Sequence, residues 1–313
     1  EEIFGPGEVG VVRNFRFVQN DAEVEISIAK DELAPPALAG EPLLIERARL
    51  TPVGYLHLRQ FINAALPPEE GFPSLADATT LFKEANVTDL IIDFRYNGGG
   101  LLSVADTMMD LLAGLTATGE PSFKIQVNDQ HPDFNDDTDN WGLFDELPET
   151  FSPIRVAFIT SSSTASASEL VINGLDPHVE VVMVGEDSFG KQVGQGRWDM
   201  HDGIEGLERA DCDVALRLTA FEIVNGENQG GYHQVGLEGT GRFTLCTAED
   251  DIFNPFGDPQ ETLVATALDW LGSGACPTSA SAGTSSARAN QRSALSPWLA
   301  AEYIPERVDG NLR

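Results

Sequence analysis

The sequence TASASE, residues 164–169, lies between two apolar segments, residues 154–160 and 181–185. Continuous apolar runs of this length are typical of strands that are buried on both faces of a parallel sheet. Residues 168–175, which follow the serine-rich turn, are expected to form a helix. The order strand, helix, strand predicts an α/β layer fold with right-handed crossovers.

The same alternation continues on both sides of this unit. Residues 90–94 (LIIDF) are another continuous apolar run, and a Gly-Gly-Gly turn follows at residues 98–100. Residues 74–86 and 101–115 carry apolar side chains at helical spacing. DPQE at residues 258–261 has the composition of a helix start, and the helix is expected to continue to Leu271. The remaining predicted strands are residues 43–49, 53–61 and 214–224.

We expect three parts along the chain. Residues 1–36 contain two alternating strand patterns and end in the linker Pro35-Pro36, as in a hairpin of a small β module. Residues 37–276 form the α/β core. Residues 277–313 are a Ser/Ala-rich linker, expected to be disordered, and a tail that ends in several apolar residues.

The composition of the 313-residue chain excludes several classes of partner. There are 50 acidic against 19 basic residues, which gives a net charge of −31. Such a surface repels nucleic acid and anionic membranes, so we expect neither as a partner. No run of 18 apolar residues is present, so no membrane span is expected. The first residue is Glu1 rather than Met, and we expect a processed chain whose signal segment is missing.

Three cysteines are present, Cys212, Cys246 and Cys276. None of them has the CxxC spacing of a zinc site, and no metal or cofactor is expected. Cys246 precedes the predicted helix that starts at residue 258 and Cys276 follows it, so a Cys246–Cys276 disulfide is the preferred pairing. This disulfide would indicate an oxidising compartment. Three free thiols remain the alternative.

Ser166 and Lys191, which are 25 residues apart in the sequence, are the candidate catalytic pair. A serine hydroxyl is a weak nucleophile and needs a base. Lys191, in GKQVGQ at residues 190–195, is the candidate base. A free lysine has a pKa of roughly 10.4, and lowering it by about 3 units costs roughly 4 kcal/mol, which burial must supply. Gln195 could orient the amine without adding charge.

Backbone amides are available to stabilise a tetrahedral intermediate. The Gly98-Gly99-Gly100 turn lets the backbone approach a reacting group closely. The amide of Ala167, directly after Ser166, is the second candidate donor, and it lies at a helix N-terminus whose dipole favours negative charge.

Other interpretations stay open at this point. No GxSxG elbow is present, but a Ser–His–Asp triad assembled from the five histidines is an alternative. Taken alone, a serine-rich turn, a Gly-Gly-Gly turn or a GK loop is most often only a loop. Asp133, Asn135, Asp137 and Asp139 have calcium-loop spacing. This loop lacks the glycine at position six and the glutamate at position twelve, so an acidic solvated loop is the simpler interpretation.

Together and in order, these motifs resemble the C-terminal processing (tail-specific) serine protease family. The resemblance rests on DFRYNGGG at residues 93–100, SASE at residues 166–169, and FGK at residues 189–191 with a glutamine four residues later. It covers about residues 43–272. It implies a ClpP/crotonase-like α/β core, Ser166 as nucleophile, Lys191 as base, Gln195 as its orienter, and Gly99 with Ala167 as the oxyanion hole.

The resemblance also implies a setting and a substrate. Residues 1–36 are similar to the end of a partial PDZ-like segment and its linker, and the usual GxGIxPD ending is replaced by residues 232–237. These departures suggest a divergent branch from the bacterial cell envelope, periplasmic, lipid-anchored or secreted. We expect an endopeptidase that cleaves unfolded or C-terminally exposed polypeptides. The alternatives are an apolar-ligand-binding protein without catalysis and an esterase or acyl hydrolase. The sequence predicts no oligomeric state.

Overall fold

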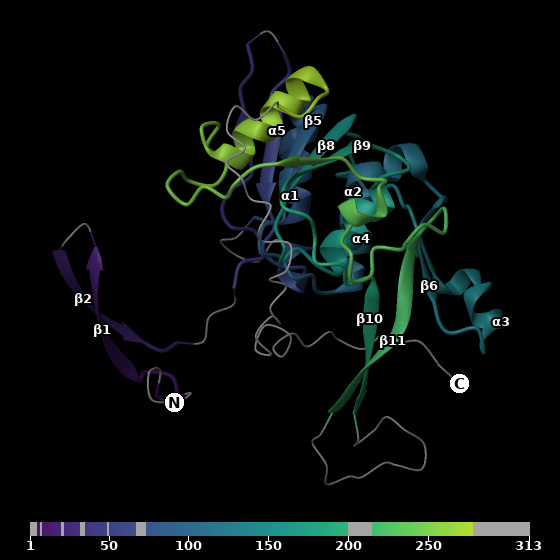
Figure 1. The fold of residues 1–313 in the computed structure, drawn as a ribbon, viewed down its shortest axis with the longest axis horizontal. Coiled ribbons are helices and arrows are strands. Elements are labelled where there is room, and N and C mark those ends of the chain that lie inside the picture. Colours follow the sequence, from purple (N-terminus) through teal and green to yellow (C-terminus); the bar gives the residue numbers. More distant parts are fainter. Residues whose placement is uncertain are drawn as a thin grey trace. The chain divides into compact units, whose positions relative to one another are not determined.

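A six-stranded sheet forms the centre of the larger part of the chain (Figure 1). The structure is a computed structural model, and it describes residues 5–6, 8–19, 22–31, 35–48, 50–66, 73–199 and 215–277. All neighbouring strands of this sheet pair in parallel except the antiparallel pair at one edge. In spatial order the strands are β12 (Leu245–Thr247), β9 (Glu180–Gly185), β8 (Arg155–Thr160), β5 (Asp89–Asp93), β4 (Val53–His57) and β3 (Leu43–Ile45).

Helices cover both faces of this sheet. Leu90 and Ile92 face the side on which α1 (Leu75–Glu84), α2 (Leu102–Ala117) and α4 (Ala167–Leu175) pack. Ile91 faces the opposite side, where α5 (Thr262–Ser273) packs through Val264 and Trp270. Because successive residues of a strand point to opposite faces, a sheet covered on both sides needs apolar residues at every position. The α/β layered fold predicted from these apolar runs is confirmed.

The start of α5 differs from the prediction. Asp258 does not cap the helix; its Oδ1 accepts a hydrogen bond from the Gln260 amide at 2.8 Å and closes a turn before the helix. The N-cap is Glu261, whose Oε2 accepts from the Val264 amide at 2.9 Å. The sequence DPQE therefore marks the approach to the helix, and the glutamate rather than the aspartate begins it.

A second, antiparallel sheet has the order β10 (Val193–Asp199), β11 (Ala215–Asn225), β6 (Pro121–Gln126) and β7 (Trp141–Leu143). Of these strands, only β11 is predicted from the sequence. The glycines at 194 and 196 weaken the local strand signal of β10, and pairing with β11 overrides it. Residues 128–150, for which the sequence predicts no helix or strand, contain β7, the short helix α3 (Pro132–Asn135) and the 3-10 helix η2 (Thr138–Asn140). Two further 3-10 helices are η1 (Asn63–Ala65) and η3 (Glu238–Thr240).

Residues 1–36 form a separate compact unit, and residues 37–313 form the other. In the first unit β1 (Val12–Gln19) and β2 (Ala22–Ala29) make an antiparallel hairpin in which Val12 is opposite Ala29. Val18 and Ile28 on this hairpin are exposed. The assignment of the hairpin to a PDZ-like segment stays a prediction.

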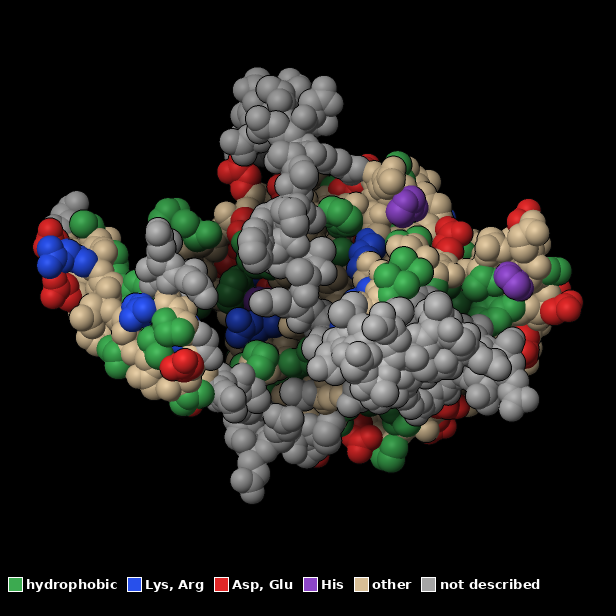
Figure 2. Space-filling view, turned by 90° about the horizontal axis from the view of Figure 1, so that it is seen from below, with side chains coloured by type: hydrophobic (Ala, Val, Ile, Leu, Met, Phe, Trp, Pro, Cys, Tyr) green, Lys and Arg blue, Asp and Glu red, His purple; other side chains and the backbone are tan. Residues whose placement is uncertain are grey.

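The Cys246–Cys276 disulfide is confirmed, with the two Cα atoms 5.1 Å apart. It joins β12 to the end of α5. Cys212 and the predicted linker and tail after residue 277 lie outside the described residues. Within the described ranges, no helix is both long and apolar enough to cross a membrane. Figure 2 shows acidic side chains spread over the visible described surface, in keeping with the net charge of −31.

The acidic loop at residues 133–139 uses its side chains for local structure. The Asn135 side chain accepts a hydrogen bond from the Val127 amide at 2.7 Å and donates to the Val127 carbonyl at 3.1 Å. Asp137 accepts from the Asp139 amide at 3.1 Å. In the part of the chain that the structure describes, no three His, Cys, Asp or Glu side chains are grouped so that they could hold a metal ion.

Candidate active site

The predicted site residues lie where three neighbouring parallel strands end. Residues 94–100 follow β5, residues 161–166 follow β8, and residues 186–192 follow β9. The carboxyl ends of parallel strands meet at one edge of the sheet, so the three loops come together there. Hydrogen bonds between them are present: Thr164 Oγ1 donates to the Phe94 carbonyl at 2.7 Å, and the Phe189 amide donates to the Thr164 carbonyl at 2.8 Å.

Ser166 is the N-cap of α4 and has an unusual backbone conformation. Its φ is 58° and its ψ is −116°. A non-glycine residue with positive φ persists only where its surroundings hold it, and such residues cluster at functional sites. The conformation places Ser166 at a sharp strand-to-helix turn, partly exposed.

The Gly99 backbone approaches Ser166 closely. A Cβ atom at Gly99 would lie 2.7 Å from the Ser166 Cβ and 2.9 Å from the Ala167 nitrogen, and the φ of Gly99 is +103°. Only glycine fits at this position. The structure therefore brings together Gly99, Ser166 and Ala167, which the sequence predicted as the nucleophile and its oxyanion hole.

The two predicted amide donors differ in their partners. Ala167 is the first residue of α4, and among the described residues no group accepts a hydrogen bond from its amide. The Gly99 amide donates to Asn97 Oδ1 at 2.9 Å. A substrate oxyanion would therefore have to replace Asn97 as the partner of Gly99. The oxyanion roles of both residues stay predictions.

A buried carboxylate, Glu169, connects Ser166 to the loop at residues 186–192, which carries Lys191 and is called the lysine loop below. Its Oε2 accepts hydrogen bonds from the Ser166 amide at 2.9 Å and the Lys191 amide at 2.8 Å, and its Oε1 accepts from the Gly190 amide at 2.6 Å. Burial raises the pKa of Glu169, and the hydrogen bonds that it accepts act in the opposite direction. Because one oxygen holds both amides, the backbones of Ser166 and Lys191 are neighbours.

Lys191 is partly buried, and burial lowers the pKa of its ammonium group. The Glu169 charge acts in the opposite direction. In the described parts of the chain, no carboxylate lies within ion-pair distance of the ammonium. A depressed pKa is what a lysine base needs, since only the neutral amine accepts a proton.

The two glutamines that follow Lys191, Gln192 and Gln195, have different environments. Gln195 is exposed and lies at a bulge in β10, paired with Thr219. No hydrogen bond joins it to Lys191 within the described structure, and its orienting role stays a prediction. Gln192 is buried: its Oε1 accepts from the amides of Gly231 and Tyr232 at 2.7 and 3.0 Å, and its Nε2 donates to Glu222 Oε1.

Asn97 connects three segments of the site. Its Nδ2 donates to the Leu58 carbonyl at 2.8 Å, and its own carbonyl accepts from the Ala165 amide at 3.0 Å and Ser168 Oγ at 3.1 Å. It therefore links the end of β4, the glycine turn and both sides of Ser166. Sequence reasoning gave no role to Asn97 or Glu169. The Ser-x-x-Glu spacing of residues 166–169 is that of a capping box, and it predicts that Glu169 accepts a hydrogen bond from the Ser166 amide.

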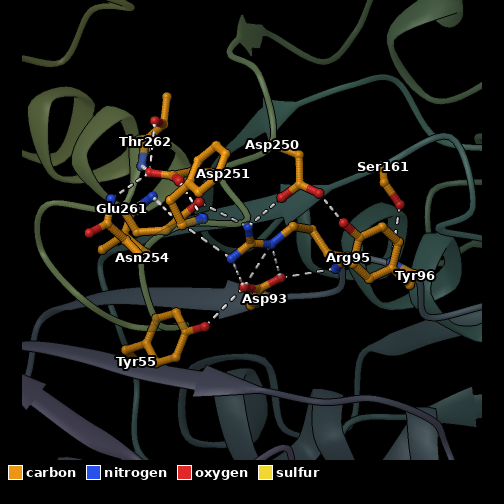
Figure 3. Close-up of polar contacts among 12 residues, drawn as sticks. Tyr55, Asp93, Arg95, Tyr96, Ser161, Asp250, Asp251, Asn254, Glu261 and Thr262 are labelled. Carbon is orange, nitrogen blue, oxygen red and sulfur yellow. Dashed lines mark hydrogen bonds and ion pairs between the residues drawn. The ribbon is translucent and has the colours of Figure 1, made fainter. Parts of the chain in front are cut away.

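Arg95 lies at the centre of a cluster of ion pairs and hydrogen bonds beside the glycine turn (Figure 3). The guanidinium group, 1% exposed, makes ion pairs with Asp93 at 2.6 Å, Glu261 at 2.9 Å and Asp250 at 2.9 Å. Tyr55 donates a further hydrogen bond to Asp93 at 2.9 Å. Tyr96 donates to Asp250, and this bond raises the pKa of Tyr96 to about 12. These contacts attach the segment before α5 to the end of β5.

The histidines do not form the alternative triad within the described residues. His57 packs its ring edge against Phe256, and His178 packs against Phe144. No described histidine makes a hydrogen bond with Ser166. His201 lies outside the described residues.

Comparisons with known proteins identify the family and the fold of the chain. Residues 52–240 match the family model described as Peptidase family S41. A carboxyl-terminal-processing protease from Synechocystis sp. is 27% identical over 151 residues, which are 48% of this chain and 31% of that protein. A solved structure from Bacteroides fragilis assigned to the S41 proteases superposes with a TM-score of 0.61 at 22% identity, over 84% of this chain and 67% of the other. The chain thus spans less than a third of the curated relative's length, and the solved structure shows the fold.

Proposed function

Because the chain belongs to peptidase family S41, we propose that it is a serine endopeptidase in which Ser166 is the nucleophile and Lys191 the general base. The observation that carries this proposal is the shared Glu169 oxygen, which holds the amides of Ser166 and Lys191. The two residues come from the ends of different strands, and this carboxylate makes them neighbours.

The proposed reaction is acyl transfer in two steps. Neutral Lys191 takes the proton from Ser166 Oγ as the oxygen attacks the substrate carbonyl. The negative oxygen of the tetrahedral intermediate receives hydrogen bonds from the amides of Ala167 and Gly99. The protonated lysine then gives its proton to the leaving amine. Water hydrolyses the acyl-enzyme by the same route and regenerates free Ser166, and Gln195 is proposed to orient the lysine amine.

We propose unfolded or C-terminally exposed polypeptides as substrates. The support is the curated relative, which is named a carboxyl-terminal-processing protease. We propose an oxidising compartment, the cell envelope or the exterior, since the Cys246–Cys276 disulfide persists only where thiols are not kept reduced.

The test is cleavage of unfolded casein by wild type, Ser166→Ala and Lys191→Ala. We expect cleavage by the wild type and a loss of at least roughly 1,000-fold in kcat in each variant. Lys83→Ala is the matched control, because Lys83 lies on α1, where among the described residues its ammonium donates only to the Pro148 carbonyl. Cleavage retained in Lys191→Ala would exclude the lysine base. Turnover of short esters without peptide cleavage would favour an acyl hydrolase instead.

A further inference from the structure

The glycine turn is preceded by a tight turn that has an unfavourable backbone conformation. The Asn97 amide donates to the Phe94 carbonyl at 3.1 Å, so Arg95 and Tyr96 are the two central residues. Tyr96 has a φ of 62°. Turns with positive φ at the second central position favour glycine or asparagine there, and a bulky aromatic residue is an outlier. Contacts outside the turn must therefore hold it.

Asp250 contacts both central residues of this turn (Figure 3). Its Oδ1 accepts from Arg95 Nη1 at 2.9 Å, and its Oδ2 accepts from the Tyr96 hydroxyl. Asp250 is 155 residues away from Arg95 in the sequence. One carboxylate from a distant segment thus holds both side chains of the strained turn, with one oxygen on each.

The turn continues directly into the groups that the mechanism uses. Asn97 is the last residue of the turn, and its side chain accepts a hydrogen bond from the Gly99 amide. The Asn97 carbonyl accepts hydrogen bonds from the Ala165 amide and the Ser168 hydroxyl. These two donors lie before and after Ser166 in the sequence. A change in the turn at residues 94–97 would therefore move both an oxyanion donor and the nucleophile.

Asp250 is itself held in place by the segment around it. The neighbouring Asp251 accepts from the Phe253 amide at 2.9 Å and from Asn254 Nδ2 at 2.8 Å. Glu261, which caps α5, pairs with the same Arg95 nitrogen, Nη1, as Asp250 does. Asp250 and Glu261 both lie between Cys246 and Cys276, so the disulfide closes the segment that carries them.

We propose that Asp250 is a positioning residue for hydrolysis, which holds the turn of Arg95 and Tyr96 so that Gly99 and Ser166 keep their reactive arrangement. This inference rests on the proposed peptidase function. Asp250 contacts neither Ser166 nor Lys191, and it acts only through the turn.

The test compares Asp250→Ala with Asp258→Ala, which removes a carboxylate from the same disulfide-closed segment. Among the described residues, the Asp258 side chain accepts only from the Gln260 amide and has no contact with Arg95 or Tyr96. In Asp250→Ala we expect kcat for a peptide substrate to fall about 10-fold with KM within about twofold, less than the roughly 100-fold that a misplacement of about 1 Å can cost. Hydrogen exchange of the amides at residues 97–101 should become faster. Asp258→Ala should change neither quantity.

A second-site variant separates positioning from general destabilisation. Asparagine adopts positive φ far more readily than tyrosine, so Asp250→Ala combined with Tyr96→Asn should recover most of the lost kcat and slow the exchange again. Tyr96→Phe, which removes one of the two hydrogen bonds, should give a smaller loss than Asp250→Ala.

Three results separate failure of this inference from failure of the proposed function. Unchanged exchange at residues 97–101 in Asp250→Ala overturns the positioning role, whatever the wild type cleaves. An unchanged kcat in that variant also overturns it when the wild type is active. A wild type that cleaves no peptide overturns the proposed function instead, and with it the catalytic part of the inference.

Discussion

At the scale of single residues, Glu169 and Gly99 fix the geometry around Ser166 from two sides. Glu169 is completely buried, and it accepts hydrogen bonds from the amides of Ser166 and Lys191. Gly99 leaves no space for a side chain beside Ser166. Neither residue needs to exchange a proton with the substrate, yet both set where the reacting atoms lie.

Glu169→Gln should affect both stability and the pH dependence of activity. A glutamine has one acceptor oxygen, so at least one of the three amides loses its partner, at a cost of about 2 kcal/mol in the free energy of unfolding. The negative charge that raises the pKa of Lys191 disappears. The lysine pKa therefore falls further, and the rising limb of kcat/KM against pH should move to lower pH. Glu186→Gln, at an exposed carboxylate of the loop that carries Lys191, is the control. A limb that moves to higher pH would contradict this account.

Gly99→Ala should reduce kcat by about 100-fold, the order expected when an oxyanion donor is displaced. The new Cβ would lie 2.9 Å from the Ala165 oxygen, and the φ of +103° is unfavourable for alanine. Steady-state kinetics with a peptide substrate measures the loss. Gly119→Ala is the control for backbone strain alone, since Gly119 has a φ of +81° but open space around it. Equal kcat in the two variants would show that the close approach to Ser166 is unimportant.

At the scale of secondary-structure elements, α2 carries two carboxylates whose partners are Ser122 on β6 and Asp145 after β7. Asp106 and Asp110 are four residues apart on one face of the helix. Burial raises the pKa of Asp106 to about 6 and that of Asp110 to about 7. Asp106 accepts from Ser122 Oγ at 3.4 Å, and Asp110 accepts from the Asp145 amide at 2.8 Å. Both carboxyl groups therefore have a lower pKa in the unfolded chain than in the folded chain.

This difference predicts a stability that falls as the pH rises. A raised pKa means that the folded chain keeps protons that the unfolded chain has released between about pH 4 and pH 7, so stability is lost across this window. Asp106→Asn combined with Asp110→Asn should reduce the loss in the free energy of unfolding between pH 5 and 8 by about 4 kcal/mol. Urea unfolding at several pH values measures it. Identical pH dependence of wild type and double variant would show that these carboxyl groups are not perturbed.

The elements of the main sheet are those that the sequence predicts best. The apolar runs at β5, β8 and β9 are unambiguous because both faces of these strands are buried. β10 and β7 lack such a signal, since glycines interrupt β10 and β7 is only three residues long (Trp141–Leu143). For the site, Ser166, Lys191 and Gly99 follow from motif spacing. Asp250 does not, because its contact with Tyr96 crosses 154 residues and no local pattern marks it.

At the scale of the whole molecule, acidic charge is the dominant property. The net charge of −31 arises from 50 acidic and 19 basic residues. Arg95 is buried among the carboxylates with which it pairs, and it offsets little of the surface charge. Repulsion among the remaining carboxylates opposes the compact state.

Salt should therefore stabilise the fold. Raising the ionic strength from about 0.01 M to about 0.2 M shortens the screening length from roughly 30 Å to less than 10 Å. We expect Tm to rise by about 3 °C, which corresponds to roughly 1–2 kcal/mol for a chain of this size. Sodium chloride and choline chloride should act equally if the effect is screening. A Tm that falls with either salt would contradict the prediction.

The central claim, that a neutral lysine activates Ser166, is tested most directly by the pH dependence of casein cleavage between pH 6 and 10. Burial lowers the pKa of Lys191 below its usual value, so the account predicts that wild-type kcat/KM rises with pH and reaches a plateau below the pKa of a free lysine, roughly 10.4. Lys191→Ala should be inactive at every pH while it stays folded by circular dichroism. Cleavage by Lys191→Ala with the wild-type pH profile would contradict the account.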